Sequence, residues 1–269
     1  MPELKMKKII AFATLAILLG ACGQQADEPA TAPAAPAEPE VSVYAAALAH
    51  PGRPEADFAN DTRRQPDKVL EFFGITAGDT VLDMFSGGGY YTEMLSHVVG
   101  ADGHVSSHTN EVVLSFSGEE FNARLADNRL TNVEVLMAAN NELDLQADRY
   151  DAAIMTLNYH DLYWVSQDYG WEKIDVEMFL AELYEGLKPG GTLGIVDHSA
   201  EAGSPREVGG SLHRIDPGVV MEDLETAGFV LDGKSDLLRS SEDDYSISVF
   251  DAAVRGKTDR FVLRYKKPE

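Results

Sequence analysis

Cysteine is the scarcest residue type in this sequence. Cys22 is the single cysteine among 269 residues. One thiol cannot form a disulfide within the chain, and it cannot supply a multi-cysteine metal site. Because it also lies close to the N-terminus, we exclude a disulfide scaffold, thiol catalysis and cysteine-metal sites.

Positive charge is also scarce. The chain has 22 Lys and Arg residues against 45 Asp and Glu residues, which gives a net charge of -23. An acidic surface repels phosphate backbones, so we expect no nucleic-acid partner. The hydrophobic fraction of 44% and the length are those of a folded protein with one sizeable core.

The sequence lacks a hydrophobic run long enough to span a bilayer, which needs about 20 apolar residues. The apolar segment 9–19 follows Lys5, Lys7 and Lys8, and "LGAC" at 19–22 comes directly after it. This arrangement predicts an export signal, and "LGAC" resembles the bacterial lipobox. We therefore predict a lipoprotein signal peptide over 1–22, lipidation of Cys22, and anchoring in the bacterial envelope. Gly23 favours the outer membrane, facing the periplasm. An ordinary cleaved signal peptide is the alternative.

Residues 23–41 are rich in Pro, Ala and Glu. Such a segment cannot bury enough apolar surface to fold, so we predict a disordered tether. The folded domain is then expected over 42–269.

Apolar strand-like runs alternate with helical stretches along this domain, a pattern that predicts a parallel sheet with helices on both faces. We expect strands at 80–85, 103–108, 133–138, 150–157, 191–198, 229–238 and 261–267. We expect helices at 43–50, 53–75 with a break at Pro66, 91–99, 119–129, 176–187 and 216–229. "RGKTDR", at 255–260, is interpreted as the turn of a closing hairpin.

The segment "DTVLDMFSGGGYYTE" predicts a strand, a glycine turn and a helix. In an open α/β sheet, this turn lies at the carboxyl edge where ligands bind. A dinucleotide site needs G-x-G-x-x-G, whereas Gly87, Gly89 and Thr92 give G-x-G-x-x-T. Asp83, at the strand end, favours the amino group of S-adenosylmethionine. A glycine turn that only connects strand and helix is the alternative.

Several segments together resemble a family of bacterial exported or lipoprotein methyltransferases, relatives of the class I S-adenosylmethionine-dependent enzymes. The resemblance covers 53–268, and the segments that carry it are "VLDMFSGGGYYTE", "YDAAIMTLNYHDLY", "LKPGGTLGIVDHSAEAGS", "LHRID", "AGFVLDGKSDLLR" and "VFDAAVRGKTDRFVLRYKKP". It implies a Rossmann-like class I methyltransferase fold, with a mostly parallel seven-stranded sheet, a C-terminal antiparallel hairpin and helices on both faces.

The resemblance also implies a cofactor site, with some departures from the family pattern. Phe85 stands where the first glycine of the loop is expected, and Asn110 (or Glu111) stands where an acidic residue usually meets the ribose. Asn140 (or Asn141) takes the place of the acidic residue that meets adenine. The cofactor-binding residues we expect are Asp83, Ser86, Gly87, Gly88, Gly89, Asn110, Asn140 and Asn158.

"LNYHDLYW" follows the fourth expected strand, so its polar side chains should face the cofactor crevice. Methyl transfer to a hydroxyl or ammonium group requires removal of a proton. His160 has an unperturbed pKa suited to a general base, and Asp161 could orient it. Tyr159, Tyr163 and Trp164 could form an apolar wall for the acceptor. A structural histidine that caps the next helix is the alternative.

More polar residues follow the fifth strand: Asp197, His198, His213, Arg214 and Asp216. A zinc, iron or manganese site is conceivable there, but no tight spacing supports one, and we assign no metal ligands. Asp216 followed by Pro217 is also typical of a helix start. The basic residues of "RGKTDR" could meet an anionic substrate, although a solvated turn explains them equally.

The sequence thus predicts an S-adenosylmethionine-dependent methyltransferase that acts on a small-molecule or lipid-like acceptor and touches the membrane only through its lipid anchor. Two alternatives stay open: a non-catalytic ligand-binding protein of the envelope, and a metal-assisted hydrolase. The oligomeric state is not predicted.

Overall fold

The computed structural model describes residues 41–269. The predicted signal peptide, the lipidation site Cys22 and almost all of the predicted tether lie outside these residues. Within 41–269, no helix combines the length and the apolar character that crossing a membrane would require. The first element is helix α1 (Val43–Leu48), which begins where the side chain of Ser42 accepts a hydrogen bond from the backbone N–H of Ala45.

The core of the protein is a seven-stranded sheet with the order β3-β2-β1-β4-β5-β7-β6. Its strands are β1 (Thr80–Met84), β2 (His104–Thr109), β3 (Val133–Met137), β4 (Tyr150–Thr156), β5 (Leu187–His198), β6 (Val230–Ser235) and β7 (Arg260–Lys266). Only β7 runs antiparallel to its neighbours β5 and β6. This topology confirms the predicted class I methyltransferase fold. The order reverses between β1 and β4, which puts the ligand crevice at their carboxyl ends.

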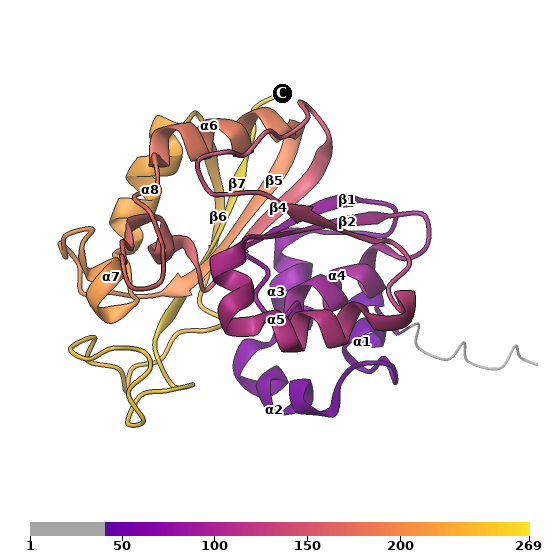
Figure 1. The fold of residues 1–269 in the computed structure, drawn as a ribbon, viewed down its shortest axis with the longest axis horizontal. Helices are drawn as coiled ribbons and strands as arrows, with labels where there is room; N and C mark the ends of the chain where they lie inside the picture. Colours follow the sequence, from indigo (N-terminus) through magenta and orange to yellow (C-terminus); the bar gives the residue numbers. More distant parts are fainter. Residues whose placement is uncertain (1–40) are drawn as a thin grey trace, which may run out of the picture. The chain divides into compact units, whose positions relative to one another are not determined.

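Helices cover both faces of the sheet (Figure 1). They are α2 (Glu55–Arg64), α3 (Pro66–Phe73), α4 (Tyr90–Val99), α5 (Glu111–Leu125), α6 (Val176–Gly186), α7 (Val208–Leu212) and α8 (Pro217–Thr226), with short 3₁₀ helices η1 (Ala126–Asn128) and η2 (Tyr159–Tyr163). One hydrophobic cluster packs α1, α3 and α4 against the sheet, and a second packs α6 and α8 against the opposite face. Pro66 occupies the first turn of α3, as predicted.

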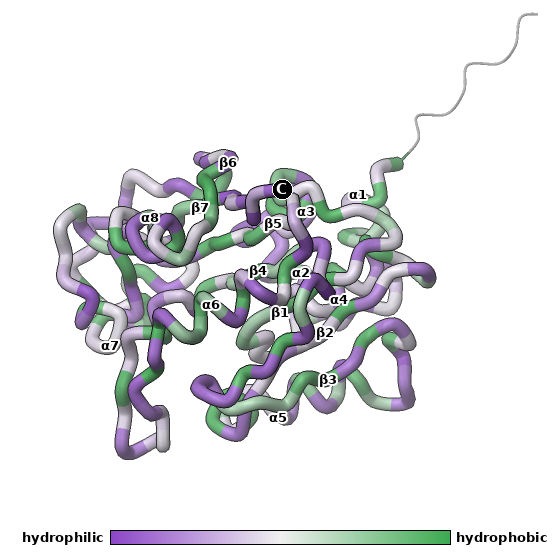
Figure 2. The backbone as a smooth tube through the Cα atoms, turned by 90° about the horizontal axis from the view of Figure 1, so that it is seen from above, coloured by the Kyte–Doolittle hydropathy of each residue, from purple (hydrophilic) through white to green (hydrophobic). Residues whose placement is uncertain are grey.

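The middle strands carry apolar side chains on both faces. β1, β4 and β5 are buried over most of their length, as expected for strands covered by helices on both sides. Figure 2 shows hydrophobic colouring along β5 and β7 and hydrophilic colouring in much of the surrounding loops. The apolar middle of the sheet therefore gives a rigid base for the polar groups at its carboxyl edge.

Two predicted elements were wrong. The helix expected at 119–129 is α5, which begins eight residues earlier because the side chain of Asn110 caps it by accepting a hydrogen bond from Val113 N–H. The C-terminal strands are not joined by a tight turn at 255–260. Residues 236–259 form a long connection from β6 to β7 that crosses the carboxyl edge of β5, where Ser199 N–H donates to the carbonyl of Asp259.

Candidate active site

The glycine loop connects β1 to α4 and turns sharply at two glycines. Gly87 has φ of 56° and Gly89 has φ of 78°, a backbone region that favours glycine. The backbone N–H of Ser86 donates to the carbonyl of His108 over 2.9 Å, which ties the loop to β2. The sequence prediction of a tight glycine turn at this edge is confirmed.

Phe85, in place of the first glycine, also adopts a left-handed conformation with φ of 50°. A bulky residue is strained there, at a cost of about 1–3 kcal/mol. Its ring is buried and stacks on Phe179 with 5.6 Å between ring centres and 6° between planes. It also contacts His108 and Trp171. The aromatic stack thus holds a conformation that glycine would adopt without strain.

Arg124, which the sequence analysis did not single out, holds the loop from α5. Its Nε–H donates to the carbonyl of Gly88 over 2.6 Å, and its side chain is almost completely buried. The guanidinium contacts the carboxylates of Asp57, at 2.8 Å, and Glu93, at 2.5 Å. These three buried charges come from α2, α4 and α5, so no local pattern links them.

Asp83 lies behind the glycine loop and does not line a cavity. Its Oδ2 accepts a hydrogen bond of 2.6 Å from the hydroxyl of Thr92, while its Oδ1 is buried without a partner. Burial raises the pKa of Asp83 to about 7. We expected the carboxyl group of Asp83 to lie at the wall of the crevice. The structure instead shows it buried, with its Oδ1 free to accept a hydrogen bond.

Asn158 connects the loop with the end of β4. Its Nδ2 donates to the carbonyls of Met84 and Phe85, at 2.8 and 3.2 Å. Its Oδ1 is buried, has no partner, and belongs to a side chain that lines the cavity formed by Ser86, Gly87 and Gly88. An unpartnered acceptor in this place fits the ammonium group of a bound amino acid.

Asn110 and Asn140 do meet, as expected for residues that follow β2 and β3. The Nδ2 of Asn110 donates to Oδ1 of Asn140 over 2.7 Å, and the Oδ1 of Asn110 caps α5. Both side chains line a second cavity, together with Glu111. Because the amide of Asn110 is already engaged, the carboxylate of Glu111, the less favoured alternative in the sequence, is the freer acceptor for ribose hydroxyls.

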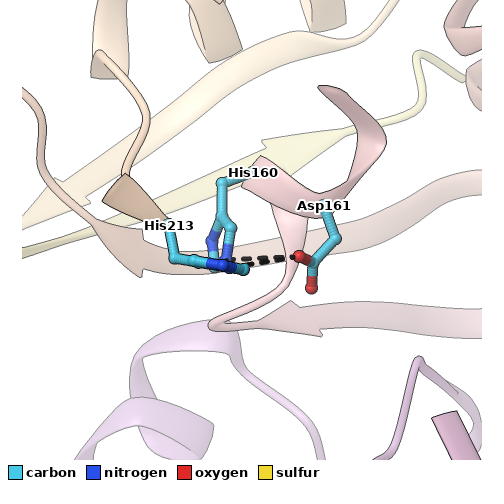
Figure 3. Close-up of side chains that lie close together, drawn as sticks. All are labelled: His160, Asp161 and His213. Atoms are coloured by element: carbon cyan, nitrogen blue, oxygen red, sulfur yellow. Dashed lines mark hydrogen bonds and ion pairs between the residues drawn. The ribbon is translucent and has the colours of Figure 1, made fainter. Parts of the chain in front are cut away.

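His160 follows β4, and its side chain lies beside those of Asp161 and His213 (Figure 3). Its Nδ1 is 2.8 Å from Oδ1 of Asp197 at the end of β5, and its Nε2 is 3.3 Å from Nδ1 of His213. Asp161 Oδ1 is 3.4 Å from the same Nε2. The sequence placed these residues only after the fourth and fifth expected strands. The structure brings them into one hydrogen-bonded cluster.

The charge state of His160 differs from the one assumed for a free imidazole. Burial alone would lower its pKa, but the carboxylates of Asp197 and Asp161 outweigh burial and raise the pKa to about 9. The imidazolium form therefore predominates at pH 7. Two imidazoles and a carboxylate are also a donor set that divalent metals use. Because the carboxylates of Asp197 and Asp161 hold the ring of His160, we interpret the cluster as a proton-handling site.

Tyr159 is not at the crevice, so its predicted place as an acceptor wall was wrong. Its side chain is fully buried in the hydrophobic cluster below α8, and its hydroxyl donates to Asp223 over 3.2 Å. The neighbouring 3₁₀ turn points His160 and Tyr159 in different directions. Trp164, which was also expected in the wall, lines the cavity beside His160, whereas the hydroxyl of Tyr163 donates to Asp223.

Asp216 and Arg214, two of the polar residues that follow the fifth strand, have structural roles. Asp216 caps α8 by accepting a hydrogen bond from Gly218 N–H. Arg214 is buried and forms a two-pronged ion pair with Asp243, at 2.8 and 3.0 Å. His198 stays at the site, where its Nδ1 lies 2.7 Å from the hydroxyl of Thr258.

Three cavities follow one another along the carboxyl edge. Trp171 lines both the Asn110 cavity and the glycine-loop cavity. The glycine-loop cavity shares Leu157, Asp161 and Trp164 with a cavity of about 620 Å³ that contains His160, His198 and His213. The arrangement can hold a nucleoside at one end, an amino-acid group at the loop and a second molecule beside the histidines.

Comparisons with known proteins agree with this geometry. Residues 60–206, more than half of the chain, match the ubiE/COQ5 methyltransferase family. A solved S-adenosylmethionine-dependent methyltransferase from Aquifex aeolicus is 26% identical, with a TM-score of 0.55, and the match covers 77% of this chain and 92% of that one. A search of curated proteins finds no match.

Other similar structures show the fold alone. An arsenic(III) S-adenosylmethionine methyltransferase from Chlamydomonas reinhardtii is 19% identical with a TM-score of 0.50, covering 84% of this chain and 73% of that one. The [4+2]-cyclase SpnF is 20% identical with a TM-score of 0.52, covering 77% of this chain and 80% of that one. The family match, the loop and the free acceptor at Asn158 agree: the chain belongs to the ubiE/COQ5 methyltransferase family, and it is a class I enzyme that uses S-adenosylmethionine as methyl donor.

Proposed function

We propose that this enzyme methylates an oxygen atom of a small molecule bound in the cavity beside His160. The observation that carries the proposal is that this cavity and the glycine-loop cavity share Leu157, Asp161 and Trp164. An acceptor beside the histidines and a cofactor at the loop would then lie on either side of one boundary. A cavity of about 620 Å³ suits a small molecule.

S-adenosylmethionine supplies an electrophilic methyl group on a sulfonium ion. The residues of the chain fit its parts. Asn158 Oδ1, buried without a partner in the lining of the glycine-loop cavity, would accept from the amino group. Glu111 would accept from the ribose hydroxyls, and Asn140 would contact the adenine end. Gly87 and Gly89 let the loop backbone approach the ligand without a Cβ clash.

His160 is the group that we propose to remove the proton. Its Nδ1–H donates to Asp197, so the ring orientation is held and Nε2 is the atom that exchanges protons. In the neutral form, Nε2 accepts the proton of the acceptor hydroxyl as the methyl group is transferred, and the imidazolium that results is stabilised by Asp197 and Asp161. With a pKa of about 9, roughly 1% of His160 is neutral at pH 7.

Calorimetry and a methyl-transfer assay test this function. We expect the protein to bind S-adenosylhomocysteine, and Asn158→Ala to weaken that binding at least tenfold. We expect His160→Gln to abolish methyl transfer to phenolic acceptors while the same cofactor product still binds. His104→Gln is the matched control, because His104 is partly exposed and pairs with Glu134 outside the cavities. Absence of S-adenosylhomocysteine binding at millimolar concentration would refute the proposal.

We also propose that the enzyme is held in the bacterial envelope by lipid on Cys22. The proposal is supported by the basic, apolar and "LGAC" segments of residues 5–22. Growth with an alkyne-labelled fatty acid should label the wild-type protein and release Cys22→Ala unlabelled into the soluble periplasmic fraction. Equal labelling of both proteins, or a cytoplasmic wild type, would contradict the proposal.

A further inference from the structure

The ion pairs of the arginines divide them into two groups. All twelve arginines of the sequence lie within the described residues 41–269. Eight of them pair with a carboxylate: Arg53, Arg124, Arg129, Arg149, Arg206, Arg214, Arg239 and Arg264. Arg63, Arg64, Arg255 and Arg260 form no ion pair with any residue of 41–269. In a chain with twice as many acidic as basic residues, this is unexpected.

These four unpaired arginines all line the cavity beside His160. Arg63 and Arg64 end α2, whereas Arg255 and Arg260 belong to the end of the β6–β7 connection and the start of β7. The two segments touch, because the guanidinium of Arg260 donates to the carbonyl of Arg63 over 2.6 Å. The fold therefore gathers four positive charges from distant parts of the sequence at one cavity.

The positive charges of the four arginines repel one another. Burial, followed by the guanidinium groups of Arg64 and Arg255, lowers the pKa of Arg63. Arg260 is 8% exposed, its Nε is buried without a partner, and burial is the largest cause of its lowered pKa. Like charges brought together without counter-ions destabilise the folded protein. A buried donor without a partner likewise indicates a missing acceptor.

The rest of the cavity is mostly apolar and aromatic. Phe116, Leu157, Trp164, Val249 and Phe250 form its walls. Among residues 41–269, Asp161 is the one carboxylate that lines it, and the imidazolium of His160 lies against that carboxylate. The unpaired arginines are therefore not neutralised by the walls.

We propose that this cavity binds an acidic, largely apolar acceptor: a carboxylate or phosphate group joined to an aromatic or similar apolar body. The arginines hold the anion, which guanidinium groups bind with paired hydrogen bonds. The aromatic walls contact the apolar part of the acceptor. Its reacting hydroxyl then lies beside His160. This inference rests on the proposed function, since it names the class of acceptor for the same site.

Matched aromatic probes test the inference by calorimetry on the protein saturated with S-adenosylhomocysteine. The probes are 1-naphthoate, 1-naphthyl phosphate and the neutral 1-naphthamide. We expect at least one anion to bind tenfold or more tightly than the amide, and to weaken as sodium chloride is raised. The stronger of the two anions identifies the carboxylate or the phosphate class.

Two variants decide whether the arginines are responsible. Arg63→Gln combined with Arg255→Gln should weaken the preferred anion at least tenfold and leave the amide unchanged. Both side chains are exposed, and removal of mutually repelling charges should leave the melting temperature unchanged or raised. Arg149→Gln removes the same charge from the surface pair with Glu134 and should not affect either probe.

The outcomes separate the two proposals. If S-adenosylhomocysteine binds but neither anion is preferred over the amide, or the double variant binds the anion as the wild type does, the inference is overturned and the proposed function stands. A melting temperature that falls by several degrees in the double variant would assign the arginines to stability and also overturn the inference. If S-adenosylhomocysteine itself does not bind, the proposed function fails.

Discussion

The Nδ1 atom of His160 lies 2.8 Å from a carboxylate oxygen of Asp197, and the same carboxylate accepts the backbone N–H of His160 over 2.8 Å. The two residues are 37 positions apart in the sequence and stand beside the ends of the adjacent strands β4 and β5. This double contact holds the imidazole against the cavity that it lines and raises its pKa.

The rate of methyl transfer should depend on the protonation of His160. Because the neutral imidazole is the proposed base and its pKa is about 9, the rate at saturating substrate should rise about tenfold per pH unit between pH 7 and 8.5 and level off above pH 9. Asp197→Asn removes the carboxylate that raises this pKa, so its rate should level off at a lower pH. A rate that is flat from pH 7 to 9 in the wild type would rule out this role of His160.

Asp83→Asn should make the protein more stable above pH 7. The folded-state pKa of Asp83, about 7, lies above its ordinary value of 3.8, so its favourable contribution is complete below pH 3.8 and is lost as pH rises through 7. Asparagine cannot ionise, so we expect a gain of about 1–3 kcal/mol at pH 8 by urea unfolding. Asp102→Asn, at an exposed position, is the control and should change little.

The Asp83→Asn variant also tests whether this destabilising carboxyl group takes part in cofactor binding. If Oδ1 of Asp83 serves the cofactor, Asp83→Asn should bind S-adenosylhomocysteine at least fivefold more weakly although the protein is more stable. Unchanged affinity would show that Asp83 has no part in cofactor binding.

Arg124→Met should destabilise the protein strongly. The substitution leaves Asp57 and Glu93 buried without their main counter-ion, which costs about 3–5 kcal/mol. Burial alone would raise the pKa of Glu93, but the nearby His97 and the hydrogen bonds from Arg129 and Arg124 outweigh it and lower that pKa to about 2. Addition of Asp57→Asn to the Arg124→Met variant should restore part of the lost stability in urea unfolding. A single variant within 1 kcal/mol of wild type would contradict the role of this network.

Phe85→Gly tests the balance between strain and packing in the loop. Glycine would relieve a left-handed conformation worth about 1–3 kcal/mol, but it removes an aromatic ring whose loss from a core costs about 3–5 kcal/mol. We expect a net loss of about 2 kcal/mol by urea unfolding. Phe85→Leu, which keeps the strain and part of the volume, is the companion variant. A more stable glycine variant would show that strain outweighs the aromatic stack.

Much of the fold could be predicted because it depends on neighbouring residues. Apolar runs bounded by glycine and proline identify the seven strands, and Pro66 identifies the start of α3. The start of α5 could not be found in the same way, because Ser115 and Ser117 interrupt its apolar pattern and both hydroxyls donate to the helix backbone. The 24-residue connection before β7 was missed because "RGKTDR" resembles a turn by composition alone.

Some features of the candidate site could likewise be predicted from the local sequence, and others could not. The sequence by itself determined the glycine turn, the residues that follow each strand and hence the cofactor class, because the carboxyl ends of parallel strands always meet at one edge. Only the tertiary structure decided that His160 meets Asp197 and His213, that Tyr159 turns into the core, and that Arg63 lies beside Arg260. Such contacts depend on strand order and on how loops cross the edge of the sheet, and residues far apart in sequence carry no local signal of either.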